Sequence, residues 1–172
     1  SQGAVGLNQM VRAVFPELLK QGCRIVHLTG KSDIDSRQLQ HPNLIERDFS
    51  DEIPGLLQNA DLAISRAGAG ALSELVVCRT PSILVPYPYA TDQHQEANAL
   101  CAAKVGAAVI VRQHQPGQGP LAETIFDLLK VRLLGRSFSE NDPLEDMRKS
   151  MDSLAGKDVE KRIVELLVNL YQ

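Results

Sequence analysis

Two polar turns carry the residues of this sequence whose types and spacing could do chemistry. Each turn follows a short apolar segment typical of a buried strand and opens a segment of helical periodicity. The first runs from Arg66 to Glu74 and includes Gly68-Ala69-Gly70, and the second runs from Asp92 to Asn98. In α/β proteins such turns lie at the carboxyl ends of parallel strands, where ligands bind. We therefore expect Ser65–Asn98 to form the floor of a ligand pocket.

The first turn has the composition of a phosphate site. Its small residues allow a ligand to approach the backbone, and the first N–H groups of a helix have no acceptor within that helix. Glu74 lies one turn into the helix, where its carboxylate could accept hydrogen bonds from a ribose diol. The same pattern also occurs where a helix only packs closely on a strand, and the helix dipole favours an acid there in any case. Both interpretations stay open on the pattern alone.

The second turn is rich in polar side chains. Gln95 and Asn98 are three residues apart on one helical face, so both could address a ligand in the same crevice. His94 is interpreted either as a solvated or capping histidine or as a catalytic base. The histidines show no spacing typical of a metal site; they are His27, His41, His94 and His114. We expect no metal and no cofactor.

The sequence excludes two other motifs, a phosphate-binding P-loop and the nucleophile motif of a serine hydrolase. Gly30-Lys31-Ser32 has the ending of a phosphate-binding P-loop, but Ile25 stands where that motif requires its first glycine. No G-x-S-x-G motif is present, so Ser65 and Ser73 lack the context of an activated nucleophile.

A parallel sheet must position the two turns, and the order of segments along the chain predicts one. We expect strands at 23–29, 43–47, 61–65, 82–85 and 107–111. We expect helices at 7–21, within 33–40, after an N-cap at Ser50 or Asp51, and at 70–79, 93–104, 121–134, 144–154 and 158–170. Leu72, Leu75 and Val76 should face inward. This alternation predicts an α/β fold with a Rossmann-like doubly wound parallel sheet, followed by a mainly helical part at 120–172.

Bulk properties fit one domain. The chain has 172 residues, a formal net charge of -3 and only three cysteines, which lie far apart. This charge gives no reason to expect nucleic acid as a partner. Scattered cysteines are typical of free thiols in a reducing cytoplasm. No apolar run approaches the roughly 20 residues that span a bilayer, so we expect a soluble cytosolic domain.

Several motifs follow one another in a recognisable order. They are Ser1-Gln2-Gly3-Ala4, Ser65-Arg66-Ala67-Gly68-Ala69, Ser73-Glu74-Leu75, Pro81–Pro88, Asp92-Gln93-His94-Gln95 with Asn98-Ala99, and Gly106-Ala107-Ala108. Together they resemble the donor-binding half of the MurG family, the bacterial peptidoglycan N-acetylglucosaminyltransferases. The resemblance covers essentially the whole chain and is strongest from Asp61 to Ala108.

The resemblance implies a two-domain glycosyltransferase of the GT-B type. Such an enzyme moves GlcNAc, with inversion, from UDP-GlcNAc to the C4 hydroxyl of lipid-linked MurNAc-pentapeptide, at the inner face of the bacterial plasma membrane. Residues 1–172 would be its single C-terminal, UDP-GlcNAc-binding domain. The first strand and the N-terminal domain, with the general base and the site for the lipid-linked acceptor, would precede this chain. We expect the chain alone to bind donor weakly and to transfer nothing.

The resemblance also implies residue roles. The substrate-binding positions would be Ser1, Gly3, Ser50, Arg66, Ala69, Gly70, Ala71, Leu72, Ser73, Glu74, His94, Gln95 and Asn98. Ser1 and Gly3 would approach the diphosphate or sugar, the backbone at 69–71 would hold the phosphates, and Glu74 would hold the ribose. Gln95, with His94 and Asn98, would contact the GlcNAc hydroxyls. Ser50 would lie at the uracil edge, and Arg66 would brace the site.

Two alternatives stay open. The chain could be the stand-alone donor-binding subunit of another GT-B transferase, whose membrane-bound partner completes the site. It could also be a non-catalytic nucleotide-binding module whose turns serve mainly for packing. Titration with UDP-GlcNAc and UDP tests the donor site, since a packing role predicts no uridine-nucleotide binding.

Overall fold

The computed structural model describes residues 5–31, 33, 39–89, 94–113, 119–135 and 142–154. Three expectations lie outside these residues: the roles of Ser1 and Gly3, most of the short helix within 33–40, and the helix at 158–170. Every strand expected from the sequence falls within the described parts.

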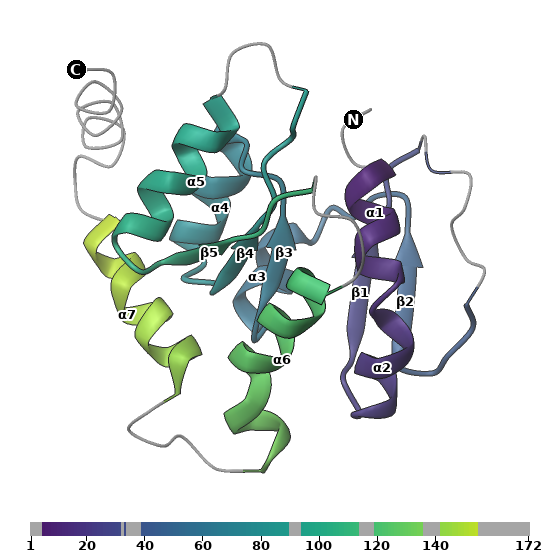
Figure 1. Cartoon of the computed structure of the whole chain (residues 1–172). Coiled ribbons are helices and arrows are strands. Elements are labelled where there is room, and N and C mark those ends of the chain that lie inside the picture. The colour runs from purple at the N-terminus through teal and green to yellow at the C-terminus, as the bar shows by residue number, and fades with distance from the viewer. Residues whose placement is uncertain are drawn as a thin grey trace.

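Helices and strands alternate along the chain, as predicted (Figure 1). The described helices are α1 (Val5–Arg12), α2 (Phe15–Lys20), α3 (Ile53–Asn59), α4 (Ala69–Val77), α5 (His94–Lys104), α6 (Gly119–Leu133) and α7 (Pro143–Leu154). The strands are β1 (Ile25–Leu28), β2 (Leu44–Arg47), β3 (Ala63–Ser65), β4 (Ser82–Leu84) and β5 (Ala108–Ile110). No helix in the described ranges is long and apolar enough to cross a membrane.

All strand pairs are parallel, which confirms the predicted sheet type. β1 pairs with β2, with Val26 opposite Ile45. β3, β4 and β5 form a second group in that order, with Ser65 opposite Leu84 and Leu84 opposite Ile110. The carboxyl ends of β3, β4 and β5 therefore meet at one edge of the sheet.

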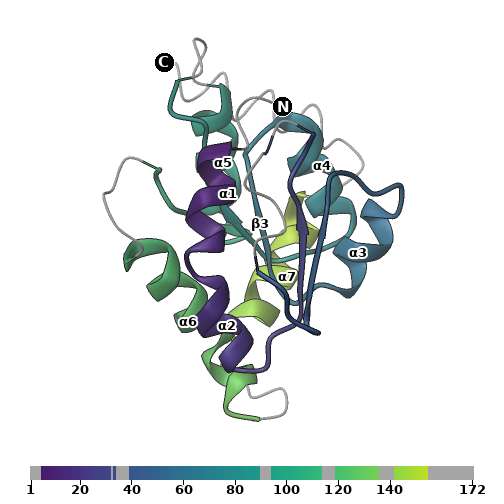
Figure 2. The same ribbon diagram turned by 90° about the vertical axis from the view of Figure 1, so that its right-hand side faces the viewer.

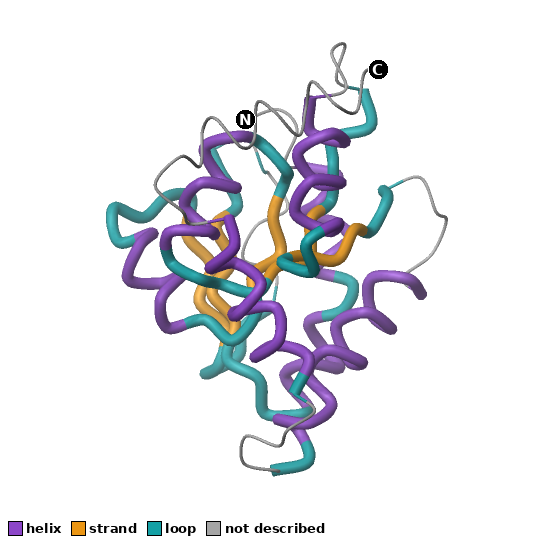
Figure 3. The backbone as a smooth tube through the Cα atoms, turned by 90° about the vertical axis from the view of Figure 1, so that its left-hand side faces the viewer, coloured by secondary structure: helices purple, strands orange, loops and turns teal. Residues whose placement is uncertain are grey.

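Helices cover both faces of the strands. Figure 2 shows α1, α2 and α6 on one side of the strands and α3 and α4 on the other, and Figure 3 shows the strands running between helices. β4 illustrates the reason, because neighbouring residues enter different cores: Ile83 joins the core with α1, α2 and α6, whereas Leu84 joins the core with α4 and α5. Side chains on a strand alternate between its faces, so apolar residues at both positions require cover on both faces.

The first predicted helix, 7–21, is wrong as a single element. The chain instead forms α1 and α2, which are separated at Ala13 and Val14. Pro16 lies in the first turn of α2. A proline has no backbone N–H and its ring clashes with the preceding turn, so it is tolerated at a helix start and breaks a helix interior.

The predicted cap of the third helix is also wrong, by one or two residues. Glu52 occupies the N-cap of α3 without a side-chain cap, and Pro54 lies in the first turn. Proline favours the first helical positions, which sets the start of α3 after Ser50 and Asp51. The Ser50 hydroxyl instead accepts a hydrogen bond from the Glu52 N–H at 3.1 Å, within the turn before the helix.

The later helices agree well with the sequence. Leu72, Leu75 and Val76 of α4 are buried, as predicted. α5 ends before Gly106, whose φ of +79° is accessible to glycine and rarely to other residues. The cysteines are free, as expected, and burial raises the pKa of the Cys101 thiol.

Candidate functional site

Arg66 contacts the segments that follow three strands, at the carboxyl edge of the sheet. It follows β3, and its Nη1 donates to the carbonyl oxygens of Val85 (3.1 Å) and Pro86 (3.3 Å), which follow β4. Its Nη2 donates to Gln113 Oε1 at 2.6 Å, beyond β5. Arg66 therefore joins the segments that follow β3, β4 and β5, and its role at a donor site stays a prediction.

An aromatic ring covers the guanidinium of Arg66. Its Cζ lies 5.4 Å from the ring centroid of Tyr87, and Tyr89 packs edge-on against Tyr87 at a centroid distance of 5.7 Å. Burial lowers the pKa of Arg66, and Tyr87 acts in the opposite direction. Since the ordinary arginine pKa lies far above neutrality, the group stays charged at neutral pH. The site therefore carries a fixed positive charge.

The start of α1 reaches the same edge of the sheet. A Cβ added at Gly6 would lie only 2.9 Å from Cδ of the Gln113 side chain, the same side chain that binds Arg66. A side chain at position 6 would therefore have to displace the end of the Gln113 side chain. The first turn of α1 and the exits of β3 and β5 are thus adjacent.

The N-terminal turn of α4 leaves backbone donors open. Its N-cap is Gly68, which supplies no side-chain cap, and the Leu72 N–H is the donor that reaches the Gly68 carbonyl, at 2.9 Å. The N–H groups at 69–71 precede that bond and have no acceptor within the helix. Ala69 and Gly70 are exposed, so these donors lie at the surface.

The glycines of this turn are not explained by packing. A Cβ added at Gly68 or Gly70 would meet no atom of the described chain within 4 Å. Neither residue has a positive φ. Of the two interpretations of the turn, close helix–strand packing is therefore disfavoured, and an open anion site is favoured.

The other predicted residues of α4 differ in what they offer a ligand. Ser73 and Glu74 are exposed. The Leu72 side chain is buried and its N–H is engaged with Gly68, so Leu72 offers a ligand little. Glu74 remains the predicted acceptor for a diol, one turn beyond the open N–H groups.

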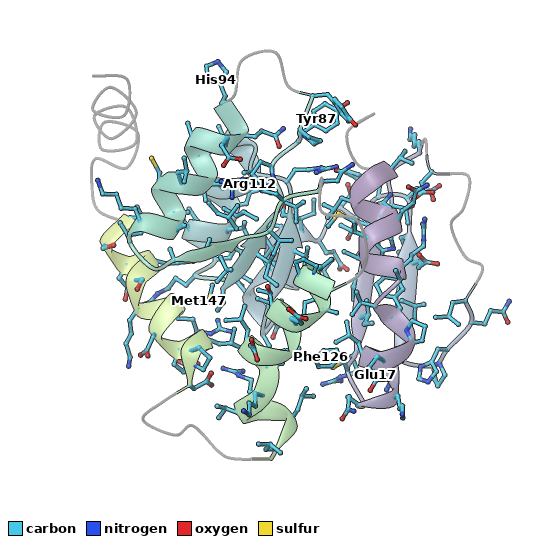
Figure 4. All side chains as sticks on the ribbon, viewed as in Figure 1. Glu17, Tyr87, His94, Arg112, Phe126 and Met147 are labelled. Carbon is cyan, nitrogen blue, oxygen red and sulfur yellow. The ribbon has the colours of Figure 1, made fainter. Side chains whose placement is uncertain are left out.

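The first turns of α5 are tied to two strand exits. Gln95 Oε1 accepts a hydrogen bond from the Tyr87 N–H at 3.0 Å, after β4. Asn98 Nδ2 donates to the Ala67 carbonyl at 2.9 Å, after β3, and Asn98 is buried. The two side chains share one face, as predicted. His94 begins the described helix and is exposed at the same end of the molecule as Tyr87 (Figure 4).

Ser50 lies next to the strand pair β1–β2 and not next to the group β3–β4–β5. It follows β2, is half-buried, and uses its hydroxyl in the turn before α3. No described contact joins Ser50 to α4 or α5. Its role at a base edge stays a prediction, as do the roles of Ser1 and Gly3, which lie outside the described residues.

Sequence reasoning missed a buried polar cluster beside this edge. Its members are Asn8, Arg12, His27, Asp33 and Glu46, which come from α1, β1, β2 and the segment after β1. The available signal was a histidine in the middle of an apolar strand, with a glutamate in the following strand. The pairing of β1 with β2 places His27 opposite Glu46.

A pocket lies away from the strand exits that Arg66 joins, although Glu46 of the buried polar cluster is among its lining residues. It has a volume of about 250 Å³ and is lined by Leu39, Gln40, His41, Leu44 and Glu46. It adjoins the start of β2, whereas Arg66 contacts the segments at the carboxyl ends of β3, β4 and β5. We place the candidate site at these carboxyl ends and not at the pocket. Within the described residues, no group of three His, Cys, Asp or Glu side chains could hold a metal ion.

Comparison with protein families gives a match over most of the chain. The profile of the glycosyltransferase family 28 C-terminal domain matches residues 1–154.

Curated relatives are similar over nearly all of this chain. A protein of Synechococcus sp. (strain CC9605) is 64% identical over 170 residues, which are 99% of this chain and 47% of that protein. A protein of Prochlorococcus marinus (strain MIT 9303) is 58% identical over 167 residues, or 97% of this chain and 46% of that protein. Both are named UDP-N-acetylglucosamine--N-acetylmuramyl-(pentapeptide) pyrophosphoryl-undecaprenol N-acetylglucosamine transferase. The chain thus spans about half the length of these relatives.

Solved structures share the fold. MurG of Acinetobacter baumannii superposes with a TM-score of 0.66 at 22% identity, over 94% of this chain and 48% of that one. The glycosyltransferase of kitacinnamycin superposes with a TM-score of 0.62 at 19% identity, over 93% of this chain and 38% of that one. At these identities the likeness supports the fold, a Rossmann-like half of the GT-B type.

Proposed function

The chain belongs to the glycosyltransferase family 28 C-terminal domain family, and we propose that it is the donor-binding domain of a peptidoglycan N-acetylglucosaminyltransferase. The full protein would transfer GlcNAc from UDP-GlcNAc to lipid-linked MurNAc-pentapeptide. The Synechococcus sp. (strain CC9605) relative, whose name specifies this reaction, is 64% identical to the chain, which supports the substrate assignment. The observation that carries the proposal is the uncapped start of α4, with its open N–H groups and unobstructed glycines.

The start of α4 would hold the diphosphate of the donor. The N–H groups at 69–71 and the positive end of the helix dipole attract phosphate oxygens. Charge builds on the UDP leaving group as the bond to GlcNAc breaks, and these fixed donors would stabilise that charge without rearranging. The role of α4 is therefore electrostatic, and no covalent intermediate is needed.

The remaining donor groups would bind around this diphosphate. Glu74 is exposed one turn further along α4 and would accept hydrogen bonds from the ribose hydroxyls. Because Gln95 Oε1 already accepts from the Tyr87 N–H, its Nε2 group is the part that would donate to a GlcNAc hydroxyl. Asn98 and Arg66 would hold the surrounding loops, and His94 would lie at the rim. Ser50 would meet the uracil edge, and Ser1 and Gly3 would approach the diphosphate or sugar.

The sheet supports the placement of this chain within a larger domain. Ile25 and Thr29 donate to β2, so the peptide groups of Val26 and Leu28 face the opposite edge of β1. Within the described residues, β1 and β3 do not pair. In Rossmann-type sheets the first strand lies between the second and the fourth. We assign that position to a strand that precedes Val5, in the order β2, β1, added strand, β3, β4, β5.

The acceptor side of the reaction would lie in an N-terminal domain. The relatives are about twice as long as this chain, and their name specifies a pyrophosphoryl-undecaprenol acceptor, which is a lipid. We therefore assign the general base and the acceptor site to that domain, and the full protein to the cytoplasmic face of the bacterial plasma membrane.

An activity assay tests the assignment. The full-length protein should transfer radiolabelled GlcNAc from UDP-GlcNAc to a lipid-linked MurNAc-pentapeptide, whereas the 172-residue chain should bind UDP-GlcNAc and transfer none. Transfer by the full-length protein to a different acceptor, with none to MurNAc-pentapeptide, would assign it to another GT-B reaction. An intact chain that binds no uridine nucleotide would overturn the donor-site proposal itself.

A further inference from the structure

A buried polar cluster supports the start of α1, next to the proposed donor site. Asn8, His27 and Asp33 are 3%, 8% and 7% exposed. The side chains of Arg12 and Glu46 complete the cluster. None of these residues has a role in the donor contacts proposed above. Buried polar groups must be hydrogen-bonded to be tolerated, so the bonding pattern defines the state of each group.

Asn8 has one orientation that fits its neighbours. Its Nδ2 lies 2.8 Å from the Thr29 carbonyl and 2.5 Å from Asp33 Oδ2, and both of these atoms are acceptors. The amide nitrogen must therefore face them, since the amide oxygen has no proton to donate. Asn8 Oδ1 then faces His27 Nε2, at 3.2 Å. This ring nitrogen accordingly meets an acceptor.

The other ring nitrogen of His27 also meets an acceptor. His27 Nδ1 lies 2.8 Å from Glu46 Oε1, and the same oxygen accepts from Arg12 Nε at 3.3 Å. An oxygen that already accepts from a guanidinium acts as an acceptor toward His27 as well, as the oxygen of an ionised carboxylate does. Both nitrogens of His27 can donate only if both carry a proton, which is the imidazolium form.

The groups around His27 also favour the charged form. Arg12 pairs with Asp33, with Nη1 at 3.1 Å from Oδ1 and Nη2 at 2.8 Å from Oδ2. The charges of Asp33 and Glu46 both act to raise the pKa of His27, because a carboxylate near the ring stabilises its protonated form.

Burial opposes this protonation state. The pKa of His27 is lowered from its ordinary value, with burial as the largest cause and the Arg12 charge acting in the same direction, although the Glu46 hydrogen bond and the Glu46 and Asp33 charges raise it. The ring also packs edge-on against Phe15 of α2, at 5.3 Å between centroids. The hydrogen bonds carry more weight, because a neutral ring would leave one nitrogen facing an acceptor with no proton between them.

We propose that His27 is a positioning residue that, as a doubly protonated imidazolium, locks Asn8 and so fixes the first turn of α1 beside the donor. Asn8 joins α1 to Thr29 at the carboxyl end of β1, and the same turn of α1 holds Gly6 against Gln113, the partner of Arg66. The link to the donor rests on the function proposed above, whereas the protonation state of His27 does not.

Nitrogen NMR of the histidine rings tests the protonation state directly. In full-length protein labelled with ¹⁵N-histidine, both His27 nitrogens should show protonated shifts at pH 7.5, above the ordinary histidine pKa of about 6.5. The His27 signal is assigned by its loss in His27→Gln or, if that variant does not fold, by its loss in His27→Asn. An unprotonated nitrogen of His27 at pH 7.5 would overturn the proposal, whether or not UDP-GlcNAc binds.

Donor kinetics test the positioning role. His27→Gln should raise the KM for UDP-GlcNAc roughly tenfold, because a small displacement of α1 misplaces the donor. In the wild-type protein the KM for UDP-GlcNAc should rise as the pH rises and His27 loses a proton. The pH at the midpoint of this rise should equal the pH at which NMR shows His27 half deprotonated. His27→Gln should abolish the pH dependence. His41→Gln changes an exposed histidine and should leave the KM unchanged. A folded His27→Gln protein with the wild-type KM and pH profile would show that His27 has only a structural role.

Discussion

At the scale of single residues, the proposed site separates into exposed side chains that are assigned to a ligand and side chains that hold the backbone. In the described structure, Arg66 donates hydrogen bonds to backbone carbonyls and to the Gln113 side chain, and Asn98 donates to a backbone carbonyl. Glu74 is exposed beside the open N–H groups of α4. The two classes should respond differently to substitution, since loss of a ligand-facing group leaves the fold intact.

Glu74→Ala should weaken the binding of UDP about tenfold or more. The change removes the carboxylate that we assign to two ribose hydroxyls, and hydrogen bonds to charged groups contribute about 1.5–3 kcal/mol. Gln95→Ala should instead reduce the preference for UDP-GlcNAc over UDP, because Gln95 is assigned to the sugar. Calorimetric titration with both nucleotides measures each effect.

Glu123→Ala is the matched control for Glu74→Ala, because it removes an exposed glutamate from α6. It should leave both affinities unchanged. Equal losses of UDP affinity in Glu74→Ala and Gln95→Ala would contradict the assignment of these two residues to different parts of the donor.

At the scale of elements, one buried and one part-buried hydrogen bond join α5 to the segments that follow β3 and β4. α5 reaches the exit of β3 through Asn98 and the exit of β4 through Gln95. α4 packs its buried face, Leu72, Leu75 and Val76, into the same core as α5. The relative position of the two helix starts therefore depends on both apolar packing and these two amides.

Asn98→Ala should lower the free energy of unfolding by about 1–3 kcal/mol, because it leaves the buried Ala67 carbonyl without its donor. Asn59→Ala removes the same kind of bond, from Nδ2 to the Gly55 carbonyl at 2.8 Å, at an exposed position. Water replaces that donor, so the loss should be smaller, about 0.5 kcal/mol. Urea denaturation measures both, and equal losses would show that the Asn98 bond has no special structural weight.

Most elements could be predicted because their cause is local. Apolar runs and helical periodicity identify the five strands and α4 to α7, and Gly106 marks the end of α5. The break at Pro16 was also local, since a proline stops a helix interior, but periodicity on both sides concealed it. The cap of α3 was missed for a similar reason, because Pro54 sets the helix start after the better capping residue Ser50.

At the scale of the whole molecule, the partners across the sheet could not be predicted. His27 meets Asn8 and Glu46 from two other elements, each 19 residues away along the chain. Such contacts depend on strand register and helix placement, which no local pattern specifies. The open turn of α4 was an expectation with two interpretations, and only the empty space around Gly68 and Gly70 favoured one of them.

The central claim is that a diphosphate-containing nucleotide occupies that empty space. Titration of the chain with UDP and UDP-GlcNAc tests it most directly when Gly70→Ala is compared with Gly55→Ala. Both positions are helical, neither has a positive φ, and an added Cβ meets nothing within 4 Å at either. Each change should therefore raise the free energy of unfolding by about 0.5 kcal/mol, since alanine favours a helix over glycine.

The account predicts that Gly55→Ala binds both nucleotides like the wild-type chain, whereas Gly70→Ala binds them at least about tenfold more weakly, because its methyl group enters the space of the phosphates. A Gly70→Ala chain that is as stable as expected and binds UDP with unchanged affinity would contradict the placement of the donor at the start of α4.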